Sequence, residues 1–371
     1  MLAAILLSIL ATPWGCATRP ADLPVARVHR APAPGPEEPW CAWFGDVGGD
    51  TLYFGISAFW GASRAAGGDP RADLRVPGPQ PIGRFDLERE RFEPPLLVGP
   101  ADAPGGVWDV LVHPDGTLWF TTFFGTAGRV DPGSGAVERL EAAGTALNEL
   151  ALAGAGTVVA SRYRAHPDGD GEVLVLGPDG AVRARLRLPA PPGLTVAAKS
   201  VAWDPLRDEI WVNTDLLGPG GEARGHDARI LDPQGRERMR FRTPELQFVT
   251  FGPDGTGWFA ERDGPRLRLR IRPPGRAASP LPTGTLVALD DAFPATDFVQ
   301  EIRGAADGSA LVTRWSGRLH HVLPDGSVRD VQLPRGPDAL YYTAVRHDGR
   351  ICATRCGEVA VVCRDLDGPG G

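Results

Sequence analysis

One hairpin pattern recurs seven times along the chain, and it constrains the fold more than any other feature. Each copy is an apolar segment, a turn of the Asp-Gly type and a second segment rich in Trp, Phe and Val. Glycine and aspartate tolerate the positive φ angles that tight hairpin turns require, so the pattern predicts β-hairpins. The copies read CAWFGDVGGDTLYFGI (41–56), VWDVLVHPDGTLWFTT (107–122), LNELALAGAGTVVASR (147–162), SVAWDPLRDEIWVNTD (200–215), LQFVTFGPDGTGWFAE (246–261), VQEIRGAADGSALVTR (299–314) and LYYTAVRHDGRICATR (340–355).

A second hairpin usually follows each copy, as in GRVDPGSGAVERL (128–140) and EVLVLGPDGAVRARLRL (172–188). Four strands at a period of roughly 40–50 residues are typical of a β-propeller. The 48 glycines and 37 prolines among 371 residues are too frequent for a helical protein. We therefore predict an all-β, seven-bladed β-propeller over residues 40–364, with a six-bladed ring and an irregular β-sandwich as alternatives.

The last repeat supplies only three strands and ends near Cys363. We expect a segment around Leu23–His29 to add the fourth strand. Pairing of the two chain ends would close the ring and remove its last open edge. Residues 365–371 would then remain as a disordered tail.

Four cysteines lie in or beside the predicted propeller, and in an exported chain they suggest two disulfides. Cys41 opens the first blade and Cys356 lies in a turn of the seventh, so a bridge between them would lock the closure. Cys352 and Cys363 could then face each other across the intervening turn. Four cysteines allow three connectivities, and this pairing is one of them. A zinc site is the rival interpretation, but the cysteine spacing is poor for a metal.

The N-terminus reads as an export signal. Its apolar run, MLAAILLSILAT, is shorter than the roughly 20 residues that span a bilayer, and small residues follow it. Cys16 resembles the lipid-attachment cysteine of a bacterial lipoprotein, and a plain secretory signal is the alternative. We predict a signal peptide over 1–15 and a lipid-anchored, Pro/Ala-rich tether over 16–39. The protein would be periplasmic or on the cell surface and would contact the membrane only through the anchor.

Charge and motifs exclude several function classes. The formal net charge of −7 argues against a dedicated nucleic-acid binder. The sequence contains no G-x-S-x-G elbow, HExxH motif, P-loop or dinucleotide-binding fingerprint. A serine hydrolase or a nucleotide-dependent enzyme is therefore not expected.

Stacking the seven copies on the turn glycine brings polar residues together at one mouth of the central channel. The starts of the inner strands contribute Asp109, Asn148, Glu149 and Glu301, whose oxygens suit Ca²⁺ or Mg²⁺. Such an ion could polarise a lactone or ester carbonyl. The same columns offer five candidate contacts to a small-molecule or protein ligand: Lys199, Tyr342, Arg162, Arg314 and Arg355. The alternative is that these acids and arginines simply pair with one another.

The segments LWFTTFFGTAGRVDPGSG (118–135) and FVTFGPDGTGWFAE (248–261) resemble blades of virginiamycin B (streptogramin) lyases. More distant resemblances are to gluconolactonase and regucalcin propellers and to NHL-type repeats. The resemblance covers roughly residues 40–364 and implies the propeller fold. It rests on motifs that build blades, which indicate a fold better than an activity.

The resemblance also implies site residues. Propeller lactonases hold a divalent metal with Glu, Asn and Asp at inner-strand starts, which match Glu149 or Glu301, Asn148 and Asp109. Streptogramin lyases use Mg²⁺, a Glu near the end of a WFTE-like strand and a nearby histidine. Glu261 matches that Glu, whereas no histidine can be placed beside it, because His226 is expected in a polar loop.

Two functional hypotheses follow. The first is a divalent-metal-dependent hydrolase or lyase acting on a small lactone or ester, with Glu261 and Asp109 as catalytic residues. The second is a non-catalytic propeller that binds a small molecule, sugar, peptide or protein partner at the same mouth. The missing histidine favours the second hypothesis, and the clustered carboxylates favour the first.

Overall fold

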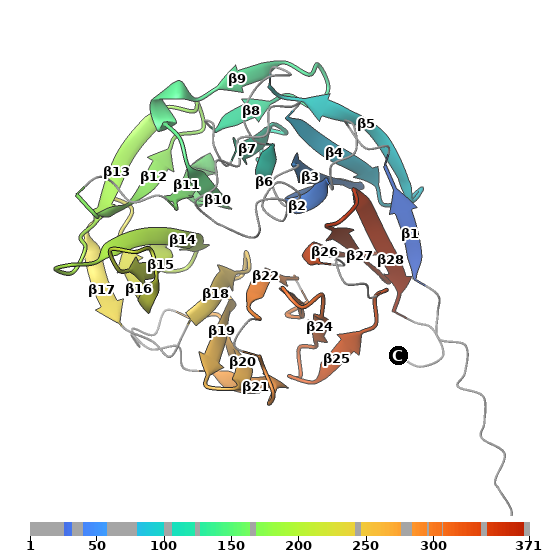
Figure 1. The fold of residues 1–371 in the computed structure, drawn as a ribbon. Helices are drawn as coiled ribbons and strands as arrows, with labels where there is room; N and C mark the ends of the chain where they lie inside the picture. Colours follow the sequence, from blue (N-terminus) through green and yellow to red (C-terminus); the bar gives the residue numbers. More distant parts are fainter. Residues whose placement is uncertain are drawn as a thin grey trace, which may run out of the picture.

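The computed structural model describes residues 26–31, 40–57, 80–99, 106–122, 127–163, 168–241, 246–275, 284–294, 297–305, 307–334 and 340–366. Within these ranges the strands form seven four-stranded antiparallel sheets. Figure 1 shows the sheets arranged around a central axis, with successive blades following one another in chain order. The all-β, seven-bladed β-propeller is therefore confirmed, and the six-bladed ring and the sandwich are wrong.

The first strand of each blade lies nearest the axis, and later strands lie further out (Figure 1). Blades one to three comprise β2 (Cys41–Gly48), β3 (Thr51–Ser57), β4 (Pro81–Asp86), β5 (Arg91–Leu97); β6 (Val107–Val112), β7 (Leu118–Thr122), β8 (Gly128–Val130), β9 (Val137–Arg139); and β10 (Leu147–Leu152), β11 (Val158–Arg162), β12 (Gly171–Leu176), β13 (Val182–Leu188). Blades four and five comprise β14 (Thr195–Asp204), β15 (Glu209–Leu217), β16 (Ala223–Leu231), β17 (Glu237–Phe241); and β18 (Leu246–Phe251), β19 (Gly257–Asp263), β20 (Arg266–Arg272), β21 (Thr285–Asp290). Blades six and seven comprise β22 (Val299–Gly304), β23 (Ala310–Arg314), β24 (Leu319–Val322), β25 (Val328–Val331); and β26 (Tyr341–His347), β27 (Arg350–Arg355), β28 (Ala360–Asp365), β1 (Arg27–Arg30).

Helical structure in the described residues is limited to two 3₁₀ turns, η1 (Glu141–Ala143) and η2 (Gly154–Gly156). No helix among those residues is long and apolar enough to cross a membrane. The secondary structure therefore consists almost entirely of the strands and their turns.

The repeated Asp-Gly turns form as their chemistry predicts. In blade two, Gly116 has φ +88°, a left-handed conformation that glycine adopts without steric cost. The carboxylate of the preceding Asp115 accepts the backbone N–H of Thr117 at 2.9 Å. Asp254 and Asp307 make the equivalent bond in blades five and six, at 2.9 Å each. The same local interactions thus set the hairpin turn in blade after blade.

Each hydrophobic core lies between adjacent blades. Trp258, on the second strand of blade five, is fully buried and packs in one cluster with Val299 and Ile302 of blade six. A Cβ on Gly304 would lie 2.1 Å from the Trp258 ring, so only glycine fits where the two sheets approach. Large aromatic rings contribute most apolar area to such cores, which explains why the repeats carry an aromatic residue after the turn.

The ring is closed by the N-terminal strand, as predicted. β1 pairs antiparallel with β28, with Val28 opposite Val362, and so completes blade seven. Figure 1 shows β1 at the outer edge of that blade, beside blade one. A strand from one end of the chain therefore occupies the last open edge of the sheet formed by the other end.

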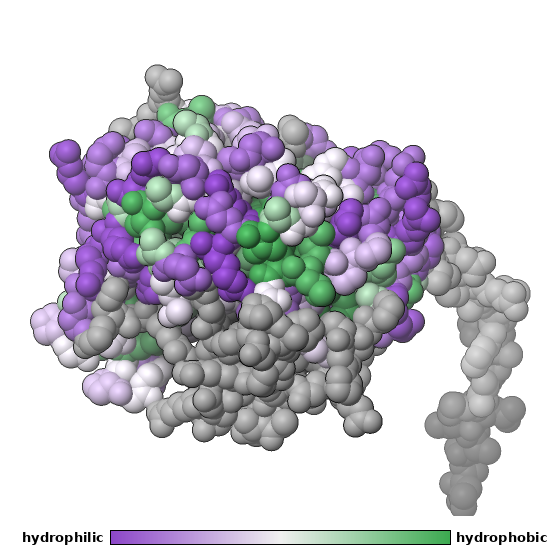
Figure 2. Space-filling view, turned by 90° about the horizontal axis from the view of Figure 1, so that it is seen from above, coloured by the Kyte–Doolittle hydropathy of each residue, from purple (hydrophilic) through white to green (hydrophobic). Residues whose placement is uncertain are grey.

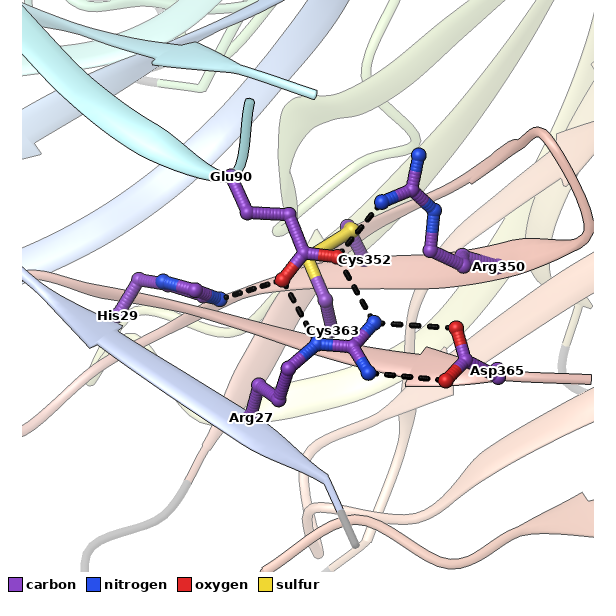
Figure 3. The surroundings of a disulfide bond; sticks show 7 residues. All are labelled: Arg27, His29, Glu90, Arg350, Cys352, Cys363 and Asp365. Atoms are coloured by element: carbon purple, nitrogen blue, oxygen red, sulfur yellow. Dashed lines mark hydrogen bonds and ion pairs between the residues drawn. A yellow bond between two sulfur atoms is a disulfide. The ribbon is translucent and has the colours of Figure 1, made fainter. Parts of the chain in front are cut away.

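A cluster of charged side chains, the closure clasp, joins blades one and seven (Figure 3). At its centre is Glu90, in the turn between β4 and β5. Its carboxylate accepts hydrogen bonds from Arg27 at 2.7 and 2.8 Å and from Arg350 at 2.6 Å, and it lies 3.0 Å from His29 Nε2. Arg27 also forms a pair of hydrogen bonds with Asp365, at 2.8 and 3.0 Å. Such paired Arg–carboxylate bonds are the stronger kind of ionic contact, and they tie three strands to one turn.

Two disulfides have the predicted pairing. Cys41 of blade one is bonded to Cys356 of blade seven, and Cys352 to Cys363 within blade seven. The second bridge joins neighbouring strands beside the closure clasp (Figure 3). Covalent, ionic and backbone contacts thus converge on the same junction of the ring.

Figure 2 views the rim of the disc, and charged and polar residues cover most of its described surface. The two largest apolar areas in that view are separated by polar residues. The exposed large apolar side chains among the described residues are Leu97, Val137, Leu152, Tyr163 and Leu286. The side of the rim seen in Figure 2 therefore presents small apolar areas rather than one broad apolar face.

Several predictions fall on residues that the structure does not describe. They are the signal peptide over 1–15, the lipid-attachment residue Cys16, most of the tether over 16–39 and most of the tail over 365–371. Within the predicted propeller, β28 runs to Asp365, one residue past the expected boundary at 364.

Candidate functional site

A β-bulge at the start of every inner strand builds the centre of the ring. In all seven blades the pairing between the first two strands shifts register at this point, at Ala42/Gly45, Val107/Asp109, Leu147/Leu150, Ala198/Ser200, Leu246/Phe248, Val299/Glu301 and Tyr341/Ala344. A bulge adds an unpaired residue and redirects side chains. Adjacent residues of a regular strand point to opposite faces. Here adjacent residues such as Asn148 and Glu149 line the same cavity, so the bulges bring more side chains to the axis.

The mouth pocket is a cavity of about 250 Å³ at the starts of the inner strands. It is lined by Trp43, Phe44, Trp108, Asn148, Glu149, Tyr163, Lys199, Phe248, Phe298, Val299, Gln300, Trp315 and Tyr342. Most of these side chains are aromatic, although aromatic residues make up only 8% of the chain. The volume lies just below the range of roughly 300–1,000 Å³ that is typical of ligand sites, so the pocket suits a small molecule or one group of a larger one.

The aromatic rings of the mouth pocket pack against one another. The Trp43 ring centroid lies 4.4 Å from that of Trp108 and 4.6 Å from that of Tyr342. Phe298 and Trp315 stack at 5.0 Å with an angle of 18° between their planes. Packed rings of this kind hold one another in place, so the pocket has rigid aromatic walls.

A few polar side chains lie among the aromatic residues of the mouth pocket. Lys199 Nζ lies 5.7 Å from the centroid of the Phe298 ring, which is a cation–π geometry. Tyr342 is 1% exposed and Gln300 is 7% exposed. The Tyr342 hydroxyl and Gln300 Nε2 have no hydrogen-bond partner among the described residues. Buried polar atoms rarely stay unpaired, because losing water without a replacement partner costs free energy.

A second cavity of about 300 Å³, the channel, extends from the mouth pocket toward the opposite face of the ring. Phe44, Glu149 and Phe248 line both cavities. The charged residues that line the channel are Asp46, Asp109, Glu149, Glu301 and Arg303. The channel therefore has four acids and one guanidinium in its lining.

Arg303 pairs with two of these acids. Its Nη1 lies 2.7 Å from Asp46 and its Nη2 lies 3.0 Å from Glu301. Asp109 instead accepts the backbone N–H of Leu150, from the inner strand of the next blade, at 2.8 Å. The acids that remain without an arginine in the channel lining are thus Asp109 and Glu149.

Burial shifts the pKa values of these acids upward. Loss of water raises the pKa of Asp109 to about 7, and the negative charge of Glu301 adds to that shift. Burial also raises the pKa of Glu149 well above its usual value; the charge of Asp109 adds to this effect, while Lys199 opposes it. For Glu301 the rise caused by burial is opposed by Arg303. Buried acids that accept a proton near neutral pH are frequent in functional sites.

The structure brings the predicted metal residues to one region but not into a ready ligand set. Asp109, Glu149 and Glu301 all line the channel, and Asn148 lines the mouth pocket beside Glu149. Asn148 Nδ2 donates to the Lys199 carbonyl at 2.7 Å. Within the described ranges, no group of three or more His, Cys, Asp or Glu side chains could hold a metal ion. This arrangement does not fit a divalent cation well, and Ca²⁺ or Mg²⁺ binding stays a prediction.

The predicted ligand contacts divide into two groups. Lys199 and Tyr342 line the mouth pocket, as described above. The three arginines lie on second strands, one strand further from the axis. Each of them contacts a nearby acid: Arg162 pairs with Glu172 at 2.9 Å, Arg314 with Asp297 at 2.6 Å, and Arg355 with Glu358 at 3.1 Å.

Glu261, which was predicted to be catalytic, also pairs with a neighbouring arginine. Its carboxylate forms two hydrogen bonds with Arg270, at 2.7 and 2.9 Å. His226 was expected in a polar loop, but it lies in β16, directly opposite Asp215 of β15. Its Nδ1 is 2.8 Å from Asp215 Oδ1. The expectation was wrong because β14, β15 and β16 are longer than most strands of the ring and extend past the expected hairpin end.

Sequence reasoning missed several residues of the two cavities. Asp46 and Arg303 lie inside inner strands, past the positions that the stacked repeats single out. Phe298 and Trp315 lie just before β22 and just after β23, outside any strand. The only sequence signal for them was that they flank a predicted inner or second strand.

Comparison with known proteins supports the fold. No protein-family model matches the chain, and no curated protein matches it in sequence. Solved structures do match. A catalytically inactive histidine-to-alanine variant of virginiamycin B lyase from Staphylococcus aureus, with quinupristin, superposes with a TM-score of 0.58 at 12% identity. That alignment covers 92% of this chain and 99% of the lyase.

Two further structures are about equally similar. A streptogramin B lyase gives a TM-score of 0.57 at 14% identity, over 92% of this chain and 97% of the lyase. The Swd1 β-propeller domain of Myceliophteria thermophila gives 0.58 at 14% identity, over 92% and 99%. The structural resemblance to virginiamycin B lyase is thus confirmed at the level of the fold. Because proteins of different kinds match equally well at such low identity, the likeness does not assign an activity.

Proposed function

We propose that this protein is a ligand-binding β-propeller that takes a small, ring-bearing or apolar group in its mouth pocket. The observation that carries the proposal is the aromatic lining, together with the unpartnered Tyr342 hydroxyl and Gln300 amide. Ligand sites are typically apolar and aromatic cavities in which a few polar groups fix orientation. The binding hypothesis is favoured over catalysis because Glu261 and all three candidate arginines already pair with neighbouring charges.

Tryptophan fluorescence tests this proposal directly, because Trp43, Trp108 and Trp315 line the pocket. A panel of methyl glycosides, phenols and small aliphatic alcohols and amines is titrated into the purified protein. We expect at least one compound to change the emission and raise the melting temperature. Trp108→Ala should abolish the response, whereas the control Trp203→Ala, in the channel and away from the mouth pocket, should retain it. Emission and melting that are indifferent to the whole panel would contradict the proposal.

A metal-dependent hydrolase or lyase acting on a lactone or ester is the second candidate. One observation favours it: burial raises the pKa values of Asp109 and Glu149, as a proton-transferring group requires. In that case Asp109 would donate a proton to, or accept one from, a ligand that reaches into the channel. If a divalent cation binds, Asp109, Glu149 and Glu301 are the carboxylates in the channel that would hold it.

We also propose that the protein is exported and anchored to a bacterial membrane through Cys16. The two disulfides support export, because such bonds persist mainly in oxidising compartments. The apolar N-terminal run and the Pro/Ala-rich segment after Cys16 support a lipid anchor and a tether. The mouth pocket would then meet ligands outside the cytoplasm.

A further inference from the structure

Acids outnumber cations where the mouth pocket meets the channel. Arg303 already pairs with Asp46 and Glu301. Of the other two acids, Asp109 lines the channel, and Glu149 lines both cavities and is influenced by Lys199 of the mouth pocket. Four acids thus share two cations in the described linings of the two cavities.

Lys199 does not act on Glu149 alone. It also acts electrostatically on Asp215, the carboxylate that is hydrogen-bonded to His226. Its ammonium group lies over the Phe298 ring on the pocket wall. Asp215 therefore offsets part of the lysine charge. Because burial raises the pKa values of Asp109 and Glu149, the excess of negative charge develops as these acids ionise, and a bound cation favours that ionised form.

The aromatic walls suit a positive ligand as well. The face of an aromatic ring is electron-rich, and it attracts cations most strongly where water is excluded. At the pocket, the Trp43 ring centroid lies 4.4 Å from that of Trp108 and 4.6 Å from that of Tyr342. Lys199 over Phe298 shows that a cation is already accommodated against one wall.

An unpartnered acceptor lies in the mouth pocket. The Tyr342 hydroxyl is buried and has no hydrogen-bond partner among the described residues. Its oxygen can accept a hydrogen bond from a ligand N–H or O–H. Tyr342 is only 1% exposed, so its hydroxyl is cut off from bulk water as well.

We infer that the ligand of the mouth pocket is a small organic cation, a protonated or alkylated amine, held by Trp43, Trp108 and Tyr342 and by the charge of Glu149. This inference rests on the proposed function, because it names the chemical class that the same pocket takes. An ammonium group places a positive charge in the pocket that Glu149 lines, and its carbon substituents contact the rings.

The test compares choline with 3,3-dimethylbutan-1-ol, which has the same shape without the charge. Both are titrated into the full chain at pH 8 and constant ionic strength, and binding is followed by tryptophan emission and calorimetry. We expect choline to bind about tenfold or more tightly than the neutral analogue, in line with the strength of a desolvated cation–π contact. Equal affinity for the two compounds would overturn the inference.

Variants identify the charged partner. Glu149→Gln should weaken choline binding by about tenfold and leave the neutral analogue unchanged. Lys199→Met should strengthen choline binding, because it removes a like charge and uncovers the Phe298 ring. The control Glu138→Gln changes an exposed acid that pairs with Arg129 on the outside of blade two, and it should alter neither affinity. Choline binding that is unaffected by Glu149→Gln and Lys199→Met would contradict the inference.

The outcomes separate this inference from the proposed function. If choline fails to bind while a neutral glycoside or phenol does, the pocket is a ligand site and only the cation is wrong. If choline and every neutral compound fail, both statements are wrong. The comparison of choline with its neutral analogue uses the unaltered protein, so it does not depend on a variant that folds.

Discussion

Asp109 lies at the bulge of β6, where its carboxylate both joins two blades and lines the channel. It accepts the Leu150 N–H from the next blade at 2.8 Å, and so it helps to join two blades through the backbone. It also lines the channel near Glu149 and Glu301 with little access to water. A buried acid in this position is disfavoured when ionised, although either protonation state can accept the Leu150 N–H.

The raised pKa of Asp109 makes stability depend on pH. The pKa of Asp109 is about 7 in the folded protein and 3.8 in the unfolded chain. The contribution of Asp109 to the free energy of unfolding is therefore fully present below pH 4 and is lost as the pH rises to 7. The substitution Asp109→Asn abolishes this pH-dependent loss of stability, because an amide does not ionise. Its side-chain oxygen can still accept the Leu150 N–H. We expect the variant to gain up to about 4 kcal/mol over the wild type at pH 8, and almost nothing near pH 4. Urea unfolding at both pH values measures this. An equal difference at the two pH values would show that the carboxylate does not titrate as stated.

Divalent cations test the same residues in another way. If Ca²⁺ or Mg²⁺ binds among the channel carboxylates, a hundredfold excess over its dissociation constant should stabilise the fold by about 2.7 kcal/mol. Melting should then rise with metal and fall with chelator, and either Asp109→Asn or Glu301→Gln should erase this response. Melting curves that ignore both metal and chelator would leave the binding propeller as the leading function.

Sequence reasoning reached some of these residues and not others. It placed Asp109, Glu149 and Glu301 at one mouth, because a repeated turn fixes the distance to each inner-strand start. It also placed Asn148 there, but it did not predict the bulges, which explain how the adjacent residues Asn148 and Glu149 can line one cavity. It also missed Arg303, whose partner Asp46 is 257 residues away along the chain and comes close only when the ring closes.

At the scale of elements, the hairpins were the easiest feature to predict, because an Asp-Gly turn and its flanking strands are set by local interactions. The closing strand was harder. β1 is only four residues long, and it was inferred because the last repeat lacked a strand rather than from its own composition. The length of β14–β16 was not predicted, and that error put His226 in a loop instead of opposite Asp215.

The two disulfides provide a matched comparison, because all four cysteines are almost fully buried. Cys41 and Cys356 are 315 residues apart, whereas Cys352 and Cys363 are 11 apart. In the chain-entropy model, replacing the long-range pair with alanines should cost about 6 kcal/mol and replacing the short-range pair about 3 kcal/mol. Denaturant unfolding of the two double variants measures the difference. A larger loss for the short-range pair would contradict the idea that the long bridge acts by restricting the unfolded chain.

At the scale of the whole molecule, the ring was predictable and the ligand was not. Seven similar repeats can bury their faces only by packing against each other around an axis, so the repeat count sets the number of blades. The ligand depends on which side chains occupy the few inner-strand starts. The residue at those positions varies between repeats, as Trp43, Glu149 and Phe248 show, and the repeat pattern does not determine it.

The proposed membrane attachment is tested on the whole protein. Cys16→Ser should move the protein from the membrane fraction to the soluble fraction of the producing bacterium, because lipid chains contribute about 0.8 kcal/mol per buried CH₂ group. Fractionation followed by immunoblotting measures the shift. Membrane association that persists in the variant would contradict lipid anchoring at this residue.

The pairing of β1 with β28 has a consequence for how the protein is made. A ribosome that has completed six blades still holds the partner of the first strand inside its tunnel or not yet translated. The closure clasp and the Cys41–Cys356 bond also wait for residues of blade seven. The nascent chain therefore keeps an open sheet edge until β28 has left the ribosome, and the ring can close only after all seven blades have been made. A chain that stays open this long is compatible with threading through a membrane before it folds.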